Sequence, residues 1–398
     1  MSAEGNARIV VCGHLCLDII PRFPPGQGQD YFRPGRLSIV DAAVTATGGA
    51  VSNVGQSLHK LGFPVRLVGK VGKDPFGDIV IQGITRTSPD LGRYIVAVRG
   101  ETTSYSVVIN PPGVDRVFFH CPGANDTFTD ADVSDDVLEG ATLFHFGYPP
   151  IMKGIWSDGG ARLLRLLARA RRAGAITSLD MSLPDPASAS GKVDWQAFLD
   201  TVLPAVDLFV PSIEELLFMS NRALFDALTA GGGGGEAIIR EITLEQTEAL
   251  ARKAVSAGVS AVLIKMGDRG AYLKTSLKGV GALPEWRSRE LYTPVFQVPQ
   301  VGGTTGAGDA TIAGFLASVS RALEPEEALT MAVAVGACCV ESPDATSGVR
   351  PWDETRARVR SGWKRCDTRV SEPGWRLLEP GVWAGPLDAK GRGQGLRL

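Results

Sequence analysis

The chain has 398 residues, a formal net charge of −2, a hydrophobic fraction of 44% and a charged fraction of 21%. These values are ordinary for a globular protein and exclude a largely disordered chain. A nearly neutral chain with no basic run is a poor candidate for a nucleic-acid-binding protein. Six cysteines without a Cys-x-x-Cys pair, together with four scattered histidines, argue against a disulfide framework and against a structural zinc site.

The N-terminal segment does not have the pattern of a signal peptide. Glu4 and Arg8 precede only a short apolar run, Ile9–Cys12. The longest nearly uncharged apolar stretch, Ala328–Val340, is too short to span a bilayer. We therefore expect a cytoplasmic protein that does not contact membranes.

The chain begins with an alternation of strand and helix. Ala7–Val11 is a short apolar run typical of a buried strand, and Val65–Val68 is the next such run. Between them, apolar residues at helical spacing predict a helix with Ser52 as its candidate N-cap and Gly62 as its stop.

Three other segments have strand patterns with no helix between them: Leu37–Thr47, Thr103–Asn110 and Arg116–His120. They predict a small antiparallel β-sheet, within about residues 15–47 and 100–120, that forms a lid over a site. Its apolar face is expected to consist of Val40, Val44, Val107, Ile109 and Phe118.

The middle of the chain repeats the strand–helix–strand pattern at a regular spacing. The predicted elements are helix Ala161–Ala173, strand Ile176–Leu179, strand Leu208–Val210, helix Ile213–Ser220, helix Leu244–Ala257 and strand Ala261–Lys265. Successive βαβ units of this kind predict an α/β fold with a doubly wound, mostly parallel sheet flanked by helices. One domain would cover residues 1–350. Residues 351–398, with tryptophans spread among Pro, Gly and Arg, are expected to form an irregular extension packed against it.

The segment Gly303–Asp309 is the sharpest candidate for a functional site. It is rich in glycine and precedes apolar residues at helical spacing. Such a turn leaves backbone N–H groups unpaired at a helix N-terminus, where they can bind a phosphate group. Asp309 would lie in the first turn, where it could accept a proton from an attacking hydroxyl. The alternative is an acidic helix cap beside an ordinary glycine turn.

Other catalytic and phosphate-binding motifs are absent from the sequence. It contains no G-x-x-x-x-G-K-[ST], and no G-x-G-x-x-G follows a predicted strand. It also lacks G-x-S-x-G and H-E-x-x-H, so a hydrolase has no support.

Two segments together resemble the signatures of the ribokinase-like (PfkB) carbohydrate kinases. Gly306-Ala307-Gly308-Asp309 resembles the C-terminal signature, and Gly48–Val54 with the glycines that follow it resembles the N-terminal one. The likeness covers roughly residues 7 to 350. It implies the ribokinase-like fold, with the antiparallel lid over a sugar.

The resemblance also implies a role for each matching residue. Asp309 would be the catalytic base, and Gly306, Ala307 and Gly308 would form the anion hole. Four residues would bind the sugar: Asp18, Gly48, Gly49 and Asn53. Gly267, Gly270 and Thr305 would lie beside the nucleotide. Taken alone, Asp18 could be a turn residue at a strand end and Asn53 a helix cap.

Two positions depart from the family pattern. Gly303 occupies the place of an aspartate associated with a monovalent cation, so activation by potassium is in doubt. Ser212 replaces the asparagine of an N-x-x-E motif whose glutamate, Glu215, is retained and is expected to serve magnesium.

The sequence therefore predicts an enzyme that uses ATP and Mg²⁺ to phosphorylate a hydroxyl of a small sugar or sugar-like substrate. Two alternatives remain at this point, a nucleoside kinase of the same family and a sugar-binding regulator with weak or no catalysis. The lid is expected to mediate a homodimer.

Overall fold

The computed structural model describes residues 8–24, 31, 34–111, 117–366 and 370–392. Its strands are β1 (Ile9–Gly13), β2 (Cys16–Arg22), β3 (Asp41–Gly48), β4 (Val65–Gly72), β5 (Ile95–Val98), β6 (Tyr105–Ile109), β7 (Val117–Cys121), β8 (Leu143–Gly147), β9 (Ile176–Leu179), β10 (Leu208–Phe209), β11 (Ala261–Lys265), β12 (Ala271–Thr275), β13 (Glu290–Thr293), β14 (Arg376–Glu379) and β15 (Val382–Ala384). Its α-helices are α1 (Gly49–Lys60), α2 (Pro75–Thr87), α3 (Asp135–Leu138), α4 (Lys153–Trp156), α5 (Ala161–Arg172), α6 (Trp195–Val202), α7 (Ile213–Ser220), α8 (Arg222–Thr229), α9 (Gly234–Glu241), α10 (Leu244–Ser256), α11 (Ala307–Ser320), α12 (Pro325–Cys339), α13 (Trp352–Arg360) and α14 (Ala389–Arg392).

An 11-stranded sheet forms the centre of the molecule, in the order β14-β15-β13-β12-β11-β10-β9-β8-β1-β4-β5. From β11 to β5 every neighbouring pair is parallel, and from β11 to β14 every pair is antiparallel. This arrangement confirms the predicted α/β fold with a mostly parallel sheet. Among the described parts of the chain, no helix has the length and apolarity needed to cross a bilayer.

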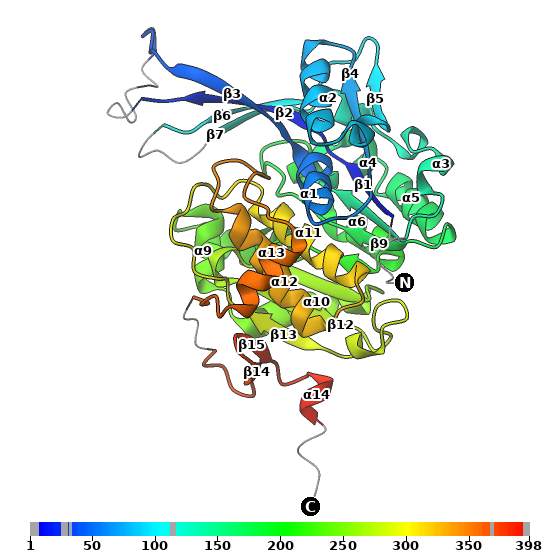
Figure 1. Ribbon diagram of the computed structural model, residues 1–398, viewed down its shortest axis with the longest axis vertical. Helices are drawn as coiled ribbons and strands as arrows, with labels where there is room; N and C mark the ends of the chain where they lie inside the picture. Colours follow the sequence, from blue (N-terminus) through cyan, green and yellow to red (C-terminus); the bar gives the residue numbers. More distant parts are fainter. Residues whose placement is uncertain (1–7, 25–30, 32–33, 112–116, 367–369, 393–398) are drawn as a thin grey trace, which may run out of the picture.

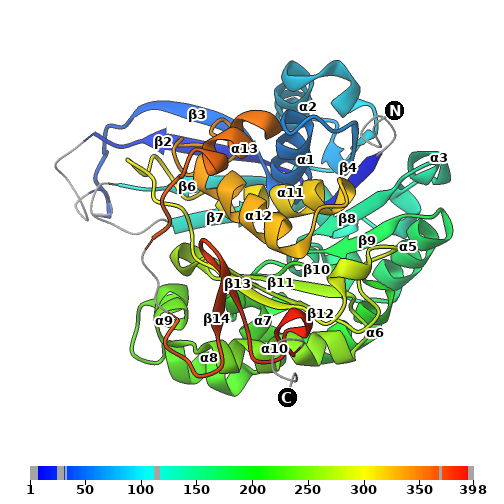
Figure 2. The same ribbon diagram turned by 60° about the horizontal axis from the view of Figure 1, so that its bottom comes forward.

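Helices cover both faces of this sheet, as Figure 2 shows, with α1, α11 and α12 on one side and α5, α6, α7 and α10 on the other. Strand β1 illustrates why both layers are needed. Its side chains alternate between the two cores, since Ile9 and Val11 pack with one helical layer while Val10 and Cys12 pack with the other. A strand that is apolar on both faces is stable only when both faces are covered.

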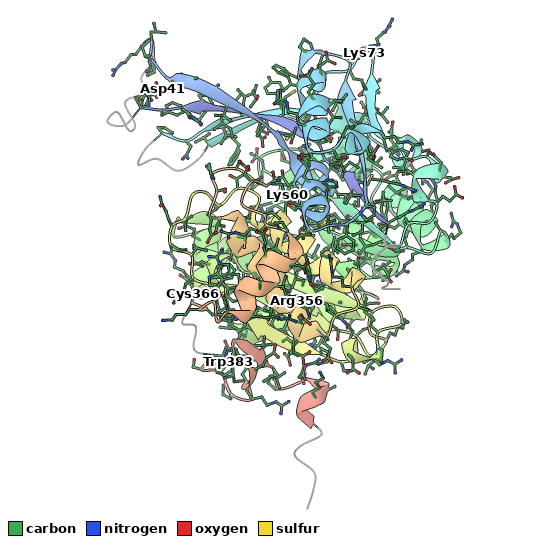
Figure 3. All side chains as sticks on the ribbon, viewed as in Figure 1. Asp41, Lys60, Lys73, Arg356, Cys366 and Trp383 are labelled. Atoms are coloured by element: carbon green, nitrogen blue, oxygen red, sulfur yellow. The ribbon has the colours of Figure 1, made fainter. Side chains whose placement is uncertain are left out.

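A second, four-stranded sheet in the order β3-β2-β6-β7 projects from the body at the place predicted for the lid (Figure 1). The pairs β2–β3 and β6–β7 are antiparallel, whereas β2–β6 is parallel. Strand β3 begins at Asp41, at the projecting end of this sheet (Figure 3), and not at Leu37. Residues 25–30, 32–33 and 112–116 of the predicted lid segments lie outside the described residues, as does Ala7 of the first predicted strand.

The apolar residues of the lid do not form one face, contrary to the sequence-based expectation. The strand register places Val44 and Phe118 on the same face as Asp18. Val107 and Ile109 lie on the opposite face, because side chains alternate along a strand and these residues pair with the neighbours of Phe118. Both faces of the lid therefore carry apolar side chains, and Val40 lies outside its strands.

The C-terminal segment is more regular than predicted. It contains helix α13 and the hairpin β14–β15, which extends the central sheet by pairing with β13. Trp375, just before β14, packs edge-on against Tyr272 of β12 and Tyr292 of β13. The segment is thus part of the sheet rather than an irregular appendage, since its strand pairing is formed with residues about ninety positions earlier.

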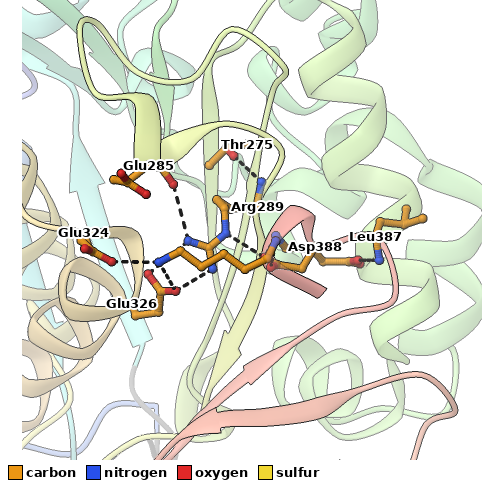
Figure 4. A network of polar contacts seen from close by, with 9 residues as sticks. Thr275, Glu285, Arg289, Glu324, Glu326, Leu387 and Asp388 are labelled. Carbon is orange, nitrogen blue, oxygen red and sulfur yellow. Dashed lines mark hydrogen bonds and ion pairs between the residues drawn. The ribbon is translucent and has the colours of Figure 1, made fainter. Parts of the chain in front are cut away.

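A buried ion network fastens this segment to the body (Figure 4). Arg289 donates through Nε to Asp388 Oδ2 at 2.9 Å and through Nη2 to Glu326 Oε1 at 2.7 Å. The backbone N–H of Glu290 also donates to Asp388 Oδ2, at 2.9 Å. Because Arg289 and Asp388 are both buried, removing Asp388 leaves the guanidinium with Glu326 as its remaining carboxylate partner among the described residues, and its Nε loses its acceptor in a medium of low dielectric constant.

We expect Asp388→Ala to lower the free energy of unfolding by about 3 kcal/mol, measured by chemical denaturation, because it deprives a buried guanidinium of an acceptor. The matched control is Glu285→Ala. The side chain of Glu285 is exposed and only its backbone carbonyl contacts Arg289, so this change should have little effect. Equal stabilities of the two variants would show that the network does not fasten the segment.

Candidate active site

Polar side chains from distant parts of the chain meet beyond the carboxyl ends of the parallel strands. His14 follows β1, Tyr148 follows β8 and Asp180 follows β9, while Lys265 is the last residue of β11. Since these strands run in the same direction, their carboxyl ends lie along one edge of the sheet, where open α/β folds bind ligands.

Asp309 lies at the centre of this group, in the first turn of α11. It is only 4% exposed, and its Oδ2 accepts a hydrogen bond from Asn53 Nδ2 at 2.9 Å. Tyr148 Oη donates to both carboxylate oxygens, at 2.8 Å from Oδ1 and 2.9 Å from Oδ2. Burial raises the pKa of Asp309, and the Asn53 amide, the positive charge of Lys265 and the Tyr148 hydroxyl act in the opposite direction. A carboxylate with a raised pKa and directed donors has the properties of a general base.

Asn53 reaches Asp309 because α1 begins earlier than its sequence pattern indicated. The N-cap is Gly48, and Ser52 lies inside the helix, where its hydroxyl donates to Thr47 Oγ1 at 2.7 Å. Asn53 therefore lies in the second turn and is not a cap. Its Oδ1 is buried and has no hydrogen-bond partner among the described residues, so it can accept a bond from a ligand.

The glycine pair at the start of α1 makes room for two polar side chains. A Cβ on Gly48 would collide with the carboxylate of Asp18, lying 2.7 Å from its Cγ. Gly49 has φ +86°, and a Cβ there would lie 2.5 Å from the backbone oxygen of His14. Burial raises the pKa of Asp18 to about 6, while contacts with Cys16 and Ser106 act against this shift. Asp18 and the glycine pair thus share one corner of the site.

His14 is buried, and neither of its ring nitrogens has a hydrogen-bond partner among the described residues. Its ring lies 5.2 Å from that of His120 and 6.1 Å from that of Tyr148. Burial, and to a lesser extent the proximity of His120, lowers the pKa of His14, so the imidazole is neutral. His120 in turn contacts Ser106 Oγ through Nδ1 at 3.0 Å, opposite Asp18 in the lid sheet. A neutral imidazole has one donor and one acceptor nitrogen, so it can form hydrogen bonds of either direction with a hydroxyl group.

The predicted anion hole lies at the N-terminus of α11. The N-cap, Gly306, has φ +78°, and a Cβ there would lie 2.5 Å from the side chain of Ala345. Gly308 is different, because a Cβ on it would meet nothing closer than the side chain of Lys265, at 3.8 Å. The first N–H groups of a helix have no partner within it, and here they belong to Ala307, Gly308 and Asp309. That of Ala307 donates to the backbone oxygen of Thr304 at 3.3 Å. Thr305 immediately precedes the N-cap.

Lys265 and Asp180 form an ion pair beside this helix terminus. Lys265 Nζ lies 2.8 Å from Asp180 Oδ1, and 3.9 Å from the place where a Gly308 Cβ would be. Burial alone would lower the pKa of Lys265, but the negative charges of Asp180 and Glu215 raise it above its usual value. The ammonium group is therefore positively charged. Asp180 Oδ2 is buried without a partner among the described residues.

Glu215 serves as part of a capping box at the start of α7. Its Oε2 accepts from the Ser212 backbone N–H at 2.6 Å, and the Ser212 hydroxyl accepts from the Glu215 N–H at 3.3 Å. The serine that replaces the expected asparagine thus has a structural role. One carboxylate oxygen of Glu215 is held by this cap.

The turn with Gly267 and Gly270 follows β11 at the same edge of the sheet. Both glycines have positive φ, at +54° and +111°, and a Cβ on Gly270 would collide with the backbone oxygen of Thr293. Arg269 fastens the turn to the end of α9 by donating to the carbonyl oxygens of Ile239 and Ile242, at 2.7 and 2.6 Å.

The structure thus brings Asn53 into contact with Asp309, and it places Asp18 against Gly48 and Lys265 near Gly308. Sequence reasoning missed Tyr148, His14 and the Lys265–Asp180 pair. The available signal for Tyr148 was its position in the sequence, directly after the apolar strand β8 and directly before Pro149-Pro150.

Sequence relatives of this chain are sugar kinases. It is 26% identical over 325 residues to a 2-dehydro-3-deoxygluconokinase of Bacillus subtilis, covering 79% of this chain and 87% of the relative. It is 24% identical over 343 residues to fructokinase-1 of Oryza sativa subsp. japonica, covering 84% of this chain and 92% of that protein.

Solved structures with the same fold include a ribokinase of Arabidopsis thaliana complexed with ribose and ATP. The TM-score is 0.65 at 20% identity, covering 90% of this chain and 98% of that one. A putative ribokinase II of E. coli in complex with ATP and Mg²⁺ has a TM-score of 0.67 at 20% identity, covering 89% and 99%. These similarities confirm the predicted ribokinase-like fold.

The family model described as pfkB family carbohydrate kinase matches residues 6–352, which is most of the chain. The match includes the two glycine-rich segments, the lid and the strand ends that hold Tyr148, Asp180 and Lys265. The chain therefore belongs to the pfkB family of carbohydrate kinases, as the resemblance of its two glycine-rich segments predicted.

Proposed function

We propose that this protein transfers the γ-phosphate of ATP to a hydroxyl group of a small sugar, with Asp309 as the base. The observation that carries the proposal is the position of Asp309 between two chemically different groups of residues. One group offers hydrogen bonds to hydroxyls, and the other offers positive charge and backbone N–H groups. A base between an alcohol site and a phosphate site is what phosphoryl transfer to a hydroxyl requires.

The hydroxyl-binding group consists of Asp18, Asn53, His14 and His120. Asn53 connects it to the base, because its Nδ2 donates to Asp309 while its Oδ1 has no partner among the described residues. Gly48 leaves space for the Asp18 carboxylate, because it has no Cβ. This carboxylate would accept hydrogen bonds from two hydroxyls of the acceptor. These contacts would hold one hydroxyl next to Asp309.

The phosphate-binding group consists of the amides of Gly306, Ala307 and Gly308 with the ammonium of Lys265. Positive charge and N–H donors aimed at one place stabilise the charge of a phosphoryl group in transfer. The turn at Gly267 and Gly270, together with Thr305, would border the nucleotide. The relatives of known structure that contain ATP support this assignment of the donor.

The site offers only a small number of protein ligands for Mg²⁺. Among the described residues, no cluster of three or more His, Cys, Asp or Glu side chains is arranged to hold a metal ion. Mg²⁺ in kinases is bound mainly by the nucleotide phosphates and water, with one or two carboxylates. Glu215 and the unpartnered Oδ2 of Asp180 are suited to that supporting role. A bound Mg²⁺ would neutralise charge on the phosphates.

Activation by a monovalent cation is not expected. Gly303 provides no carboxylate, and a Cβ there would lie 2.9 Å from the backbone oxygen of Pro343, so a side chain is disfavoured at this position.

Two alternatives remain open. A nucleoside kinase would use the same base and phosphate site with another acceptor. A sugar-binding regulator would not need Asp309 to be held by two donors, so the contacts of Asn53 and Tyr148 favour an active enzyme. A coupled ADP-release screen over pentoses, hexoses, sugar acids and nucleosides distinguishes the three cases.

We expect Asp309→Asn to lower kcat by at least about 100-fold, because general base catalysis typically contributes that much. The affinity for ATP, measured by calorimetry, should change little, since the phosphate site is intact. A variant with activity within a few-fold of the wild type would remove Asp309 from the role of base.

We expect Gly48→Ala to raise the KM for sugar by about 10-fold, because its Cβ would displace the Asp18 carboxylate and cost a charged hydrogen bond. The KM for ATP should stay within two-fold. Gly231→Ala is the matched control, since nothing lies within 4 Å of a Cβ there. If both KM values rise together in Gly48→Ala, Asp18 does not belong to the sugar site.

The lid presents exposed apolar side chains that a second copy of the chain would cover. Phe118 is 55% exposed and Phe119 is 62% exposed, and they point to opposite faces of β7, which is an edge strand. An exposed apolar edge strand favours association with another chain, and two-fold dimers are the commonest oligomers. We therefore propose a homodimer through the lid.

Light scattering at micromolar concentration should give the mass of a dimer for the wild type. The double variant Phe118→Asp with Phe119→Asp should give a monomer, because charge opposes burial of that edge. The control is Leu277→Asp. Leu277 lies just after β12, outside the lid, and is 84% exposed, so this variant should stay dimeric. A monomeric wild type would exclude this proposal.

A further inference from the structure

The backbone of Tyr148 has an unfavourable conformation directly beside the proposed base. Its φ and ψ are 66° and 44°, in the left-handed region, and the next residue is Pro149. The left-handed region is rare for a residue with a large side chain, and a following proline disfavours helical conformations further. Strain of this kind persists where surrounding contacts demand it, and it is concentrated at functional sites.

The fold holds this conformation from both sides. Gly147, at the end of β8, lies beside Gly13 of β1, and its backbone oxygen accepts from His14 N–H at 3.2 Å. A Cβ on Gly147 would collide with Ala50 of α1. The chain then turns sharply into Pro149 and Pro150, which are buried. The result is that the Tyr148 side chain is aimed at Asp309, which lies 161 positions further along the sequence.

The hydroxyl of Tyr148 bridges the two oxygens of the Asp309 carboxylate. Oδ2 accepts from both Asn53 Nδ2 and Tyr148 Oη, whereas among the described residues Oδ1 accepts only from Tyr148 Oη. A carboxylate oxygen has two lone pairs, so the unused acceptor position is on Oδ1. The two donors therefore fix the plane of the carboxylate and leave one defined lone pair for the acceptor hydroxyl.

The titratable groups around this pair come from several elements. Lys265 on β11, Asp180 after β9 and Glu215 on α7 interact electrostatically with Asp309. Cys339 on α12 also faces it, but burial raises the pKa of this thiol to about 12, so it is uncharged. His14 lies beside the Tyr148 ring and is neutral. Burial, followed by the negative charge of Asp309, raises the pKa of Tyr148 well above its usual value, so its hydroxyl stays protonated and remains a donor.

We propose that Tyr148 is a positioning residue for the base, which orients the Asp309 carboxylate and favours its ionised form by donating to both of its oxygens. The proposal rests on the proposed function for the role of Asp309. Tyr148 contacts the base, Asp309, and does not belong to the proposed phosphate-binding group.

The kinetic test is Tyr148→Phe, which keeps the ring and removes the hydroxyl. We expect kcat to fall by about 10-fold with the KM for ATP within two-fold of the wild type. Removing a donor to the ionised form raises the pKa of Asp309, so the acid limb of the kcat–pH profile should move upward by about one pH unit. A purely structural role would not move this limb.

Tyr272→Phe is the matched control. Tyr272 is also buried, and its hydroxyl donates to a carboxylate at 2.9 Å, but this carboxylate is that of Glu290 on β13 and not that of Asp309. This variant should leave the acid limb unchanged. A wild-type kcat and acid limb in Tyr148→Phe, or an equal shift in Tyr272→Phe, would overturn the proposal.

A second measurement needs no activity. Because the pKa of Asp309 is raised in the folded state, wild-type stability falls as pH rises from the unfolded pKa to the folded one. In Tyr148→Phe, the decrease in stability with rising pH, measured by thermal unfolding, should continue to a higher pH than in the wild type. Tyr148→Phe should not have this effect when Asp309 is replaced by Asn. An effect of Tyr148→Phe that is independent of pH and of Asp309 would contradict the proposal. A wild type that shows this linkage but phosphorylates no acceptor would instead contradict the proposed function.

Discussion

The burial of one carboxylate, that of Asp309, is the constraint on which the site depends. An ionised group that is 4% exposed is unfavourable unless donors reach it. The donors come from α1, through Asn53, and from the end of β8, through Tyr148. The arrangement of the helices on the parallel sheet makes this meeting possible, since α1 and α11 pack in the same layer (Figure 2).

Glycine residues at the strand and helix ends make the close approach possible. Gly48 leaves room for Asp18, Gly49 for His14, and Gly147 for α1. The first two contacts join a polar group to a backbone that a methyl group would push away, and the third joins the backbone of β8 to the Ala50 side chain. The glycines near the proposed acceptor site therefore serve packing first, and we expect their effect on sugar binding to be indirect. Gly308 is the exception, because a Cβ on it would meet nothing closer than the side chain of Lys265, at 3.8 Å.

The sequence predicted the fold and the glycine-rich segments because their signals are local. Apolar periodicity identifies strands and helices, and Gly306–Asp309 shows a helix N-terminus without knowledge of the rest of the chain. Tyr148 and the Lys265–Asp180 pair could not be found in this way, since their partners lie 161 and 85 positions away. The same holds for the hairpin β14–β15, whose pairing with β13 has no local signal, and for the lid faces, which depend on register.

Several polar atoms of the site are buried without a hydrogen-bond partner among the described residues, so a bound ligand would complete their hydrogen bonding. His14, Asn53 Oδ1 and Asp180 Oδ2 have no partner among the described residues, and each such group lowers the stability of the free protein. A polyol on one side of Asp309 and phosphate groups on the other would supply the missing bonds. Part of the binding free energy would thus come from satisfying groups that the fold has already desolvated. In the function proposed for this site, ligand binding would therefore be gained at the expense of the stability of the unliganded chain.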